Sequence, residues 1–225
     1  MKSSADSPDA NNRIAQGFAA PKVKIDGIMA LADARAAVAH GADFIGFVFV
    51  KGRRRCMTMD DTRDIIRSLG STCPPAVGLF VNEDAATVRH VVAECGLQYV
   101  QLCGAETPDY CTELGLLHWK VINLHSADDY ARMPPYVEAA GFVLEGADNG
   151  PGGTGQTWDW SLASAAPRDR PFFIAGGLTP DNVRSAVAQV QPWGVDVSSG
   201  VETNGKKDPD KIAAFIHHAR DASLP

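Results

Sequence analysis

The sequence of 225 residues lacks any apolar run of the ~18 to 20 residues that a membrane-spanning helix requires. Its first 20 residues, rich in Ser, Asp, Asn and Ala, contain no apolar stretch, so we expect a flexible tail and no secretory signal. The five cysteines form no CxxC pair, and no spacing of His, Cys and Asp suggests a metal site. These absences indicate a cytoplasmic protein with reduced thiols and no membrane partner.

An excess of positive charge is also missing. The chain has 21 Lys and Arg against 27 Asp and Glu, which gives a formal net charge of −6. Proteins that bind nucleic acids usually present a basic face, so we expect no nucleic-acid partner. A local basic pocket for a small anion is compatible with this balance.

From Lys22 onward, short apolar runs alternate with amphipathic stretches. The mean interval between the starts of the runs is about 24 residues, the length of one strand, one helix and two loops. The eight predicted strands start near Val23, Phe44, Ala76, Tyr99, Lys120, Gly141, Phe172 and Gly194.

The segments between these runs carry helix start and stop signals. A capping residue such as Thr58, Thr179 or Asp208 precedes several of them, with proline at the first helical position after the last two. Glycine follows others directly, as expected at a helix end. The clearest predicted helices span residues 30–40, 58–69, 87–95, 179–189 and 208–222.

Eight buried strands, each followed by a helix, predict an α/β fold of the (β/α)8 TIM-barrel type. The alternative is a doubly wound open sheet, which usually has a glycine-rich fingerprint after its first strand, and KIDGIMALAD is not one. No linker follows residue 20. We therefore expect a flexible N-terminal tail at residues 1–20 and one barrel domain at residues 21–225.

A TIM barrel places its active site at the carboxyl ends of the strands, where two small-residue loops stand out. The segments IAGGLTP and VDVSSGVE follow the seventh and eighth strands, and their amides and hydroxyls suit a phosphate group. The alternative is that these glycines only form strand-to-helix turns. The predicted phosphate-binding residues are Gly153, Gly176, Gly177, Ser198, Ser199 and Gly200.

Carboxylates at two other strand ends are candidates for acid–base chemistry. Asp26 follows the first strand and Glu145 the sixth, so the two can face each other across the barrel mouth. The alternative is that each of them only pairs with an arginine. One of Arg53, Arg54 and Arg55, just past the second strand, could hold a substrate carboxylate, or the three could form a solvated basic loop.

The ordered motifs KIDG, QLCG, GGTGQTWDW, AGGLTPDNV and DVSSGVE resemble the phosphoribosylanthranilate isomerase family of tryptophan biosynthesis. The resemblance covers about residues 22 to 220. It implies a single-domain (β/α)8 barrel, an intramolecular oxidoreductase (an aldose–ketose isomerase), that acts on N-(5′-phosphoribosyl)anthranilate without a cofactor. It also implies a phosphorylated small-molecule substrate and a monomer or homodimer.

In this family's Amadori rearrangement, a general acid opens the ribose ring to a Schiff base and a general base then removes the C2 proton. The resemblance assigns the phosphate to Gly177, Ser199 and Gly200. It places Asp196 near the ribose and Arg55 on the anthranilate carboxylate.

Three positions depart from the family pattern. Asp26 stands where the family has a cysteine base, Glu145 where it has an aspartate acid, and Cys103 where it has a histidine at the barrel mouth. An unperturbed aspartic acid has a pKa of about 3.9, against about 8.5 for cysteine, which makes its carboxylate a weaker base. The related histidine-pathway isomerase performs the same rearrangement with two aspartates, so Asp26 is an acceptable base.

The departures leave two alternatives open. The chain could be a diverged enzyme that performs another isomerisation or a lyase reaction on a different monophosphorylated substrate. It could also be a non-catalytic protein that kept the phosphate site. The segments LFVNE and QLCGAE contain no second phosphate loop, so we predict a ligand with one phosphate.

Overall fold

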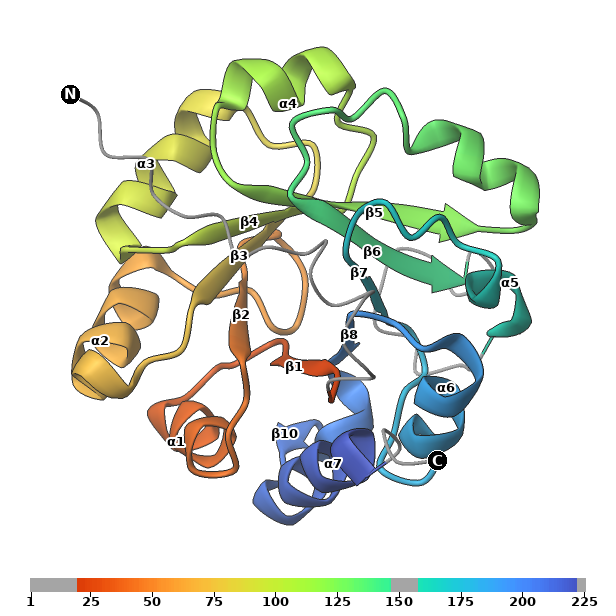
Figure 1. Cartoon of the computed structure of the whole chain (residues 1–225). Helices are drawn as coiled ribbons and strands as arrows, with labels where there is room; N and C mark the ends of the chain where they lie inside the picture. The colour runs from red at the N-terminus through yellow and green to blue at the C-terminus, as the bar shows by residue number, and fades with distance from the viewer. Residues whose placement is uncertain (1–19, 147–157, 222–225) are drawn as a thin grey trace, which may run out of the picture.

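The computed structural model describes residues 20–146 and 158–221, in which eight parallel strands close into a barrel surrounded by helices (Figure 1). Each strand pairs with the next along the chain, and the barrel closes where Lys24 of the first strand pairs with Asp196 of the last. The predicted (β/α)8 barrel is confirmed, and the open-sheet alternative is wrong. The barrel strands are β1 (Lys22–Ile25), β2 (Phe44–Val48), β3 (Ala76–Phe80), β4 (Tyr99–Leu102), β5 (His118–Leu124), β6 (Gly141–Gly146), β7 (Phe172–Ile174) and β8 (Gly194–Val197).

The helices cover the outer face of these strands (Figure 1). The α-helices are α1 (Leu31–Ala39), α2 (Met59–Leu69), α3 (Ala85–Cys95), α4 (Pro108–Leu114), α5 (Ser161–Ser164), α6 (Val183–Val190) and α7 (Pro209–Asp221). Short 3₁₀ segments are η2 (Gly70–Thr72), η3 (Ala127–Arg132) and η5 (Ser199–Val201). After η5 the chain forms a small hairpin of β9 (Glu202–Thr203) and β10 (Lys206–Lys207), which the sequence did not predict.

Three of the five predicted helix starts agree with the observed ones, whereas the helix predicted to start at Thr87 starts at Ala85 and is capped by Asp84. Thr58 caps α2 by accepting a hydrogen bond from the backbone N–H of Asp61 at 3.1 Å, and Asp208 accepts from two N–H groups of α7. The helix predicted to start after Thr179 starts instead at Val183. Asn182 explains the difference, because its side chain accepts from the Thr179 N–H at 2.7 Å and keeps the preceding segment in a loop.

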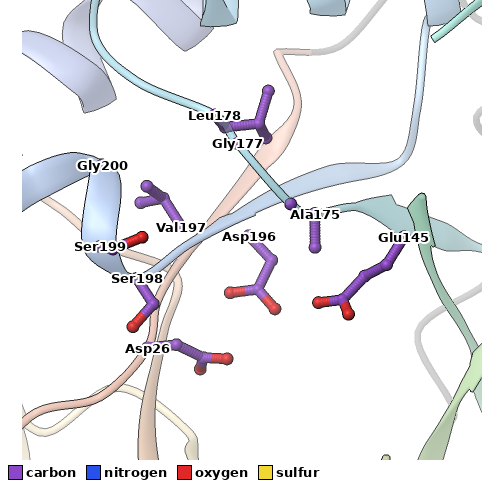
Figure 2. Close-up of a pocket in the computed structure, with 11 residues that line it drawn as sticks. Asp26, Glu145, Ala175, Gly177, Leu178, Asp196, Val197, Ser198, Ser199 and Gly200 are labelled. Atoms are coloured by element: carbon purple, nitrogen blue, oxygen red, sulfur yellow. The ribbon is translucent and has the colours of Figure 1, made fainter. Parts of the chain in front are cut away.

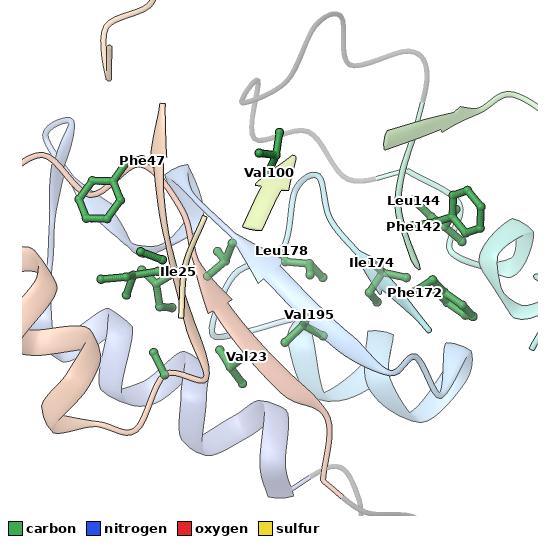
Figure 3. Close-up of a cluster of buried hydrophobic side chains, with 14 of the residues drawn as sticks. Val23, Ile25, Phe47, Val100, Phe142, Leu144, Phe172, Ile174, Leu178 and Val195 are labelled. Atoms are coloured by element: carbon green, nitrogen blue, oxygen red, sulfur yellow. The ribbon is translucent and has the colours of Figure 1, made fainter. Parts of the chain in front are cut away.

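The main hydrophobic core fills the space between the barrel and its helices. Every second residue of β1 points to this layer, so Val23 and Ile25 are fully buried there. Figure 3 shows members of the cluster from strands that are distant in sequence, including Val195 of β8 and Phe172 of β7. This packing fixes the strands on which the site residues stand.

A second, smaller core fills the amino-terminal part of the barrel interior. Phe44 of β2, Trp119 of β5 and Phe173 of β7 come from strands on different sides of the barrel, yet their rings lie 4.7 to 5.9 Å apart. Trp193, just before β8, packs on the Phe173 ring at 5.0 Å. We refer to these four side chains as the aromatic plug. It leaves only the carboxyl end of the barrel for polar groups.

The predicted tail lies outside the described residues except for Ala20. Among the helices of the described ranges, none has the length and apolar character needed to cross a membrane.

Removing a ring from the aromatic plug should destabilise the fold. Phe173 is 1% exposed, so Phe173→Ala leaves a cavity and should lower the free energy of unfolding by about 3 to 5 kcal/mol in urea titrations. Leu117→Ala is the control, because Leu117 is 58% exposed and should change stability by less than about 0.5 kcal/mol. Equal effects of the two variants would contradict the assignment of the plug as a core.

Candidate active site

The polar site occupies the carboxyl end of the barrel interior, above the aromatic plug. Side chains alternate along a strand, so Lys24 and Asp26 share the inward face of β1, and Val143 and Glu145 share that of β6. Gly46 of β2 makes room for this layer, because a Cβ there would overlap the Oδ1 atom of Asp26. The strand pattern therefore brings the two predicted acid–base residues to the same end of the barrel.

Lys24 is the centre of a buried ion network. Its side chain is fully buried, and its Nζ lies 2.6 Å from Asp26 Oδ2 and 2.6 Å from Asp196 Oδ2. Nζ also donates to Gln101 Oε1 at 2.8 Å. The other oxygen of each aspartate, Oδ1, is buried and has no hydrogen-bond partner among the described residues. Buried oxygens of this kind are rare and are available to accept from a ligand.

Burial and charge act in opposite directions within this network. Burial alone would lower the pKa of Lys24, but the carboxylates of Asp196 and Asp26 outweigh it and raise that pKa. Burial, reinforced by the charge of Asp26, raises the pKa of Asp196 well above its usual value despite Lys24. The lysine is therefore charged, and the carboxyl of Asp196 is shifted toward its protonated form.

Glu145 faces the same space and is shifted toward its protonated form. Burial raises the pKa of the Glu145 carboxyl, and the charge of Asp26 adds to this, while Lys24 opposes it. Among the described residues nothing donates a hydrogen bond to this carboxyl. Cys103 lies beside it, and burial followed by the charge of Glu145 raises the pKa of the thiol, so the thiol stays protonated.

The loops after β7 and β8 form the rim of a cleft above these carboxyls. The cleft has about 370 Å³ of empty space including its open mouth. Figure 2 shows the carboxyl groups of Asp26, Asp196 and Glu145 facing one another, with Ser198 and Ser199 on the loop beside them. Its lining residues are Asp26, Glu145, Ala175, Gly176, Gly177, Leu178, Asp196, Val197, Ser198, Ser199 and Gly200.

Glycine is required in these loops for two reasons. Gly176 and Gly177 have φ values of 83° and 70°, which side chains with a Cβ rarely adopt. A Cβ on Gly200 would overlap the carbonyl oxygen of Leu178, so the two loops touch there. Asn182 fixes the first loop by donating to the Gly177 carbonyl at 2.9 Å. The two loops therefore form one continuous surface of small residues.

Arg55 lies beside the cleft, held by Glu202. Arg55 Nε donates to Glu202 Oε1 at 2.7 Å, and its side chain crosses Gly27, where a Cβ would overlap it. Arg54 contacts the other Glu202 oxygen at 2.5 Å. Lys207 donates to Glu202 and, at 2.8 Å, to the Ser198 carbonyl. This cluster links the loop after β2 to the loop after β8.

The charged groups of this cluster shift one another's pKa values. Burial would raise the pKa of Glu202, but hydrogen bonds from Arg55 and Arg54 and the charge of Lys207 lower it to about 2. Burial lowers the pKa of Lys207 to about 8, although Glu202 opposes this. Within the described residues no hydrogen bond uses the two terminal nitrogens of Arg55, which leaves them available to an anion.

The structure brings most of the predicted site residues together. Asp26, Glu145, Asp196 and the residues of both predicted phosphate loops line one cleft. Arg55 and Cys103 lie next to it without being among its lining residues. Gly153 lies outside the described residues.

Sequence reasoning missed Lys24, Gly46, Asn182, Glu202 and Lys207. A usable signal existed for Lys24, since a lysine two residues before Asp26 in a buried strand must share its inward face. The contacts of Glu202 with Arg54 and Arg55 span 147 residues or more, so no local pattern indicates them.

Neutralising Glu202 should destabilise the fold in a pH-dependent way. The pKa of Glu202 is about 2 in the fold and 4.5 ordinarily, so its stabilising contribution is complete above pH 4.5 and disappears as the pH falls through about 2. Glu202→Gln should therefore cost about 2 kcal/mol of unfolding free energy at pH 7, and the difference from wild type should shrink below pH 4.5.

Urea titrations at pH 7 and pH 3 test this. Asp60→Asn is the control, since Asp60 is 80% exposed and its pair with Arg63 should contribute little at either pH. A cost for Glu202→Gln that is the same at both pH values would contradict an ionic origin.

Comparisons with known proteins agree on one family. The profile of N-(5′-phosphoribosyl)anthranilate (PRA) isomerase matches residues 23–218. The N-(5′-phosphoribosyl)anthranilate isomerase of Desulforudis audaxviator is 45% identical over 212 residues, which cover 89% of this chain and 98% of that protein.

Solved structures give the same result. Phosphoribosyl anthranilate isomerase from Thermotoga maritima superposes with a TM-score of 0.82 at 39% identity, covering 89% of this chain and 99% of that one. A structure of the enzyme in complex with reduced 1-(o-carboxyphenylamino)-1-deoxyribulose 5-phosphate has a TM-score of 0.78 at 37% identity, with the same coverage of both chains. With its barrel, its paired loops and this agreement along nearly its whole length, the chain belongs to the N-(5′-phosphoribosyl)anthranilate isomerase family.

Proposed function

We propose that this chain isomerises N-(5′-phosphoribosyl)anthranilate to 1-(2-carboxyphenylamino)-1-deoxyribulose 5-phosphate, with Asp26 as general base and Glu145 as general acid. The observation that carries the proposal is the position of these two carboxyls, on β1 and β6, facing one cleft whose rim is the pair of small-residue loops. The reaction needs a proton donor and a proton acceptor around one sugar, and the two carboxyls stand in different environments.

Glu145 has the properties of the acid. Its carboxyl is shifted toward the protonated form by burial and by the charge of Asp26. This shift favours its role as the proton donor to the ribose ring oxygen, which opens the ring to the Schiff base. Activity should decline on the alkaline side as this proton is lost.

Asp26 has the properties of the base. Its Oδ2 forms an ion pair with Lys24 at 2.6 Å, while its Oδ1 has no hydrogen-bond partner among the described residues. That free oxygen can accept the C2 proton of the Schiff base, and the resulting enolamine becomes the ketone. An aspartate can thus take the role of the cysteine that the family pattern has at this position.

The remaining groups hold the two ends of the substrate. The loops with Gly177, Ser199 and Gly200 take the phosphate, together with Gly176 and Ser198, and the sequence adds Gly153 as a further candidate. Arg55 takes the anthranilate carboxylate through its terminal nitrogens. Asp196 lies between them near the ribose. We assign no cofactor, because the substrate's own amine accepts the electrons.

The location and assembly of the chain belong to the same proposal. All five cysteines are free thiols in the structure, which supports a reducing compartment such as the cytoplasm. A monomer or a homodimer suits the family, in which the Thermotoga maritima enzyme is described as dimeric with engineered monomers.

Turnover of phosphoribosylanthranilate generated in situ tests the proposal. Wild type should convert it, and Asp26→Asn and Glu145→Gln should each lower kcat by at least about 100-fold, because each removes one proton-transfer step. Glu83→Gln, at the same end of the barrel but not in the cleft lining, is the matched control and should keep wild-type kcat. A folded wild type without turnover would remove the assignment.

Gly46→Ala tests the placement of Asp26. The new methyl group would overlap Asp26 Oδ1, so the carboxylate must move and kcat should fall about 100-fold with KM little changed. Gly78→Ala on the neighbouring strand meets only the side chains of Leu97 and Phe80, so it should lower stability without this loss of kcat. Equal kcat losses in the two variants would contradict a specific effect on Asp26.

A further inference from the structure

A lysine in the middle of the first barrel strand is buried where an apolar residue would be expected. Lys24 is 0% exposed, and its ammonium contacts Asp26, Asp196 and Gln101, each within 2.8 Å. Its Nζ donates to Asp196 and Gln101 and forms an ion pair with Asp26. Because Lys24 is fully buried among these partners, any role in the reaction must act through its neighbours.

The groups around Lys24 are mostly acidic. Asp26 directly follows β1, Asp196 lies on β8 and Glu145 on β6. Gln101 lies on β4, and the protonated thiol of Cys103 directly follows that strand. Strands β2, β3 and β7 consist of apolar residues and glycine, so they add no titratable side chain.

Two further lysines act on this network from outside it. Lys207 acts on Asp26 from the loop after β8. Lys120 of β5 acts on Cys103, while its own ammonium donates to the backbone carbonyls of Leu102 and Gly104. The carboxyls of Asp26, Asp196 and Glu145 thus lie around one buried ammonium, that of Lys24.

We propose that Lys24 is a positioning residue for the isomerisation, whose single buried ammonium orients Asp26 as the proton acceptor and sets which carboxyl of the site carries the negative charge. The inference rests on the proposed function, which requires one ionised and one protonated carboxyl in the same cleft. Lys24 fixes the orientation of Asp26 because it binds Oδ2 and leaves Oδ1 open.

The charge count explains why the division is stable. A buried carboxylate is strongly disfavoured without a counter-charge, and among the described residues Lys24 is the counter-charge in direct contact with Asp26 and Asp196. Asp196 and Glu145 are both shifted toward protonation by burial and by the charge of Asp26. Ionising a second carboxyl would leave a buried negative charge without compensation.

The test compares Lys24→Met and Lys24→Gln with wild type. Both variants remove the charge, and Gln keeps a hydrogen-bond donor in case Met impairs folding. We expect kcat to fall by at least about 30-fold and the acid limb of the pH–rate profile to move up by about 1 to 3 pH units, with KM changed less than about 3-fold.

Lys22→Met is the matched control. Lys22 is two residues earlier on the same strand, and its partner is Asp43 outside the cleft. It should leave kcat and the pH profile unchanged. A folded Lys24 variant that loses stability but keeps the wild-type acid limb would overturn the inference and leave Lys24 a purely structural residue.

A measurement on the unmodified site covers the case in which neither variant folds. We would record ¹³C NMR spectra of protein labelled at the aspartate carboxyls, with the signals assigned through Asp26→Asn and Asp196→Asn. At pH 7 the inference requires one ionised and one protonated carboxyl among these two residues. Two ionised or two protonated carboxyls would overturn it.

The two proposals fail separately. Absence of turnover by the wild type removes the proposed reaction, whereas the NMR result decides the division of charge whether or not the chain turns over this substrate. Turnover with an unchanged acid limb in both Lys24 variants removes only the role of Lys24.

Discussion

The alternation of side chains along strands that close into a barrel is the constraint on which this site depends. In a closed barrel every second residue of each strand points to the same interior, and these residues must fill it together. Here the amino-terminal half of the interior is filled by aromatic rings, with Trp119 and Phe173 packed at 4.7 Å. Polar side chains are therefore confined to the other half, below the mouth of the cleft.

Barrel closure has an electrostatic consequence. Lys24 and Asp196 are 172 residues apart in the sequence, and the pairing of β1 with β8 places them side by side. Burial makes each of these charges costly alone, so the lysine and the carboxyls are stable only as a set. The roles proposed for Asp26 and Glu145 therefore depend more on the other charged groups of this set than on the two residue types themselves.

Local signals in the sequence were sufficient for the barrel and for much of the site. Apolar runs of β-branched and aromatic residues located the strands, and the caps at Thr58 and Asp208 located two helix starts. Gly176 and Gly177 could be predicted as phosphate-binding residues because small residues after two predicted strands favour such a loop. This pattern is visible without knowledge of their spatial neighbours. The rule that places TIM-barrel sites at the carboxyl ends of strands then selected Asp26 and Glu145.

Features that depend on tertiary contacts could not be found in this way. The start of α6 shifts to Val183 because Asn182 binds the backbone of Thr179, a competition that helix propensity does not describe. Gly46 looks like an ordinary strand residue until the carboxylate of Asp26 is placed against it. Glu202 lies in a charged loop of the sequence and becomes a buried partner of two arginines only in the fold.

The ion pair between Glu202 and Arg55 affects the free energy with which Arg55 can bind a ligand. Ordering a free arginine side chain costs up to about 2 kcal/mol of rotamer entropy, which normally reduces the affinity for the ligand that orders it. Arg55 is already ordered by Glu202 and by the close surface of Gly27. That entropy is lost when the chain folds, so the substrate carboxylate that we propose for Arg55 would meet a preorganised fork and retain more of its intrinsic binding energy.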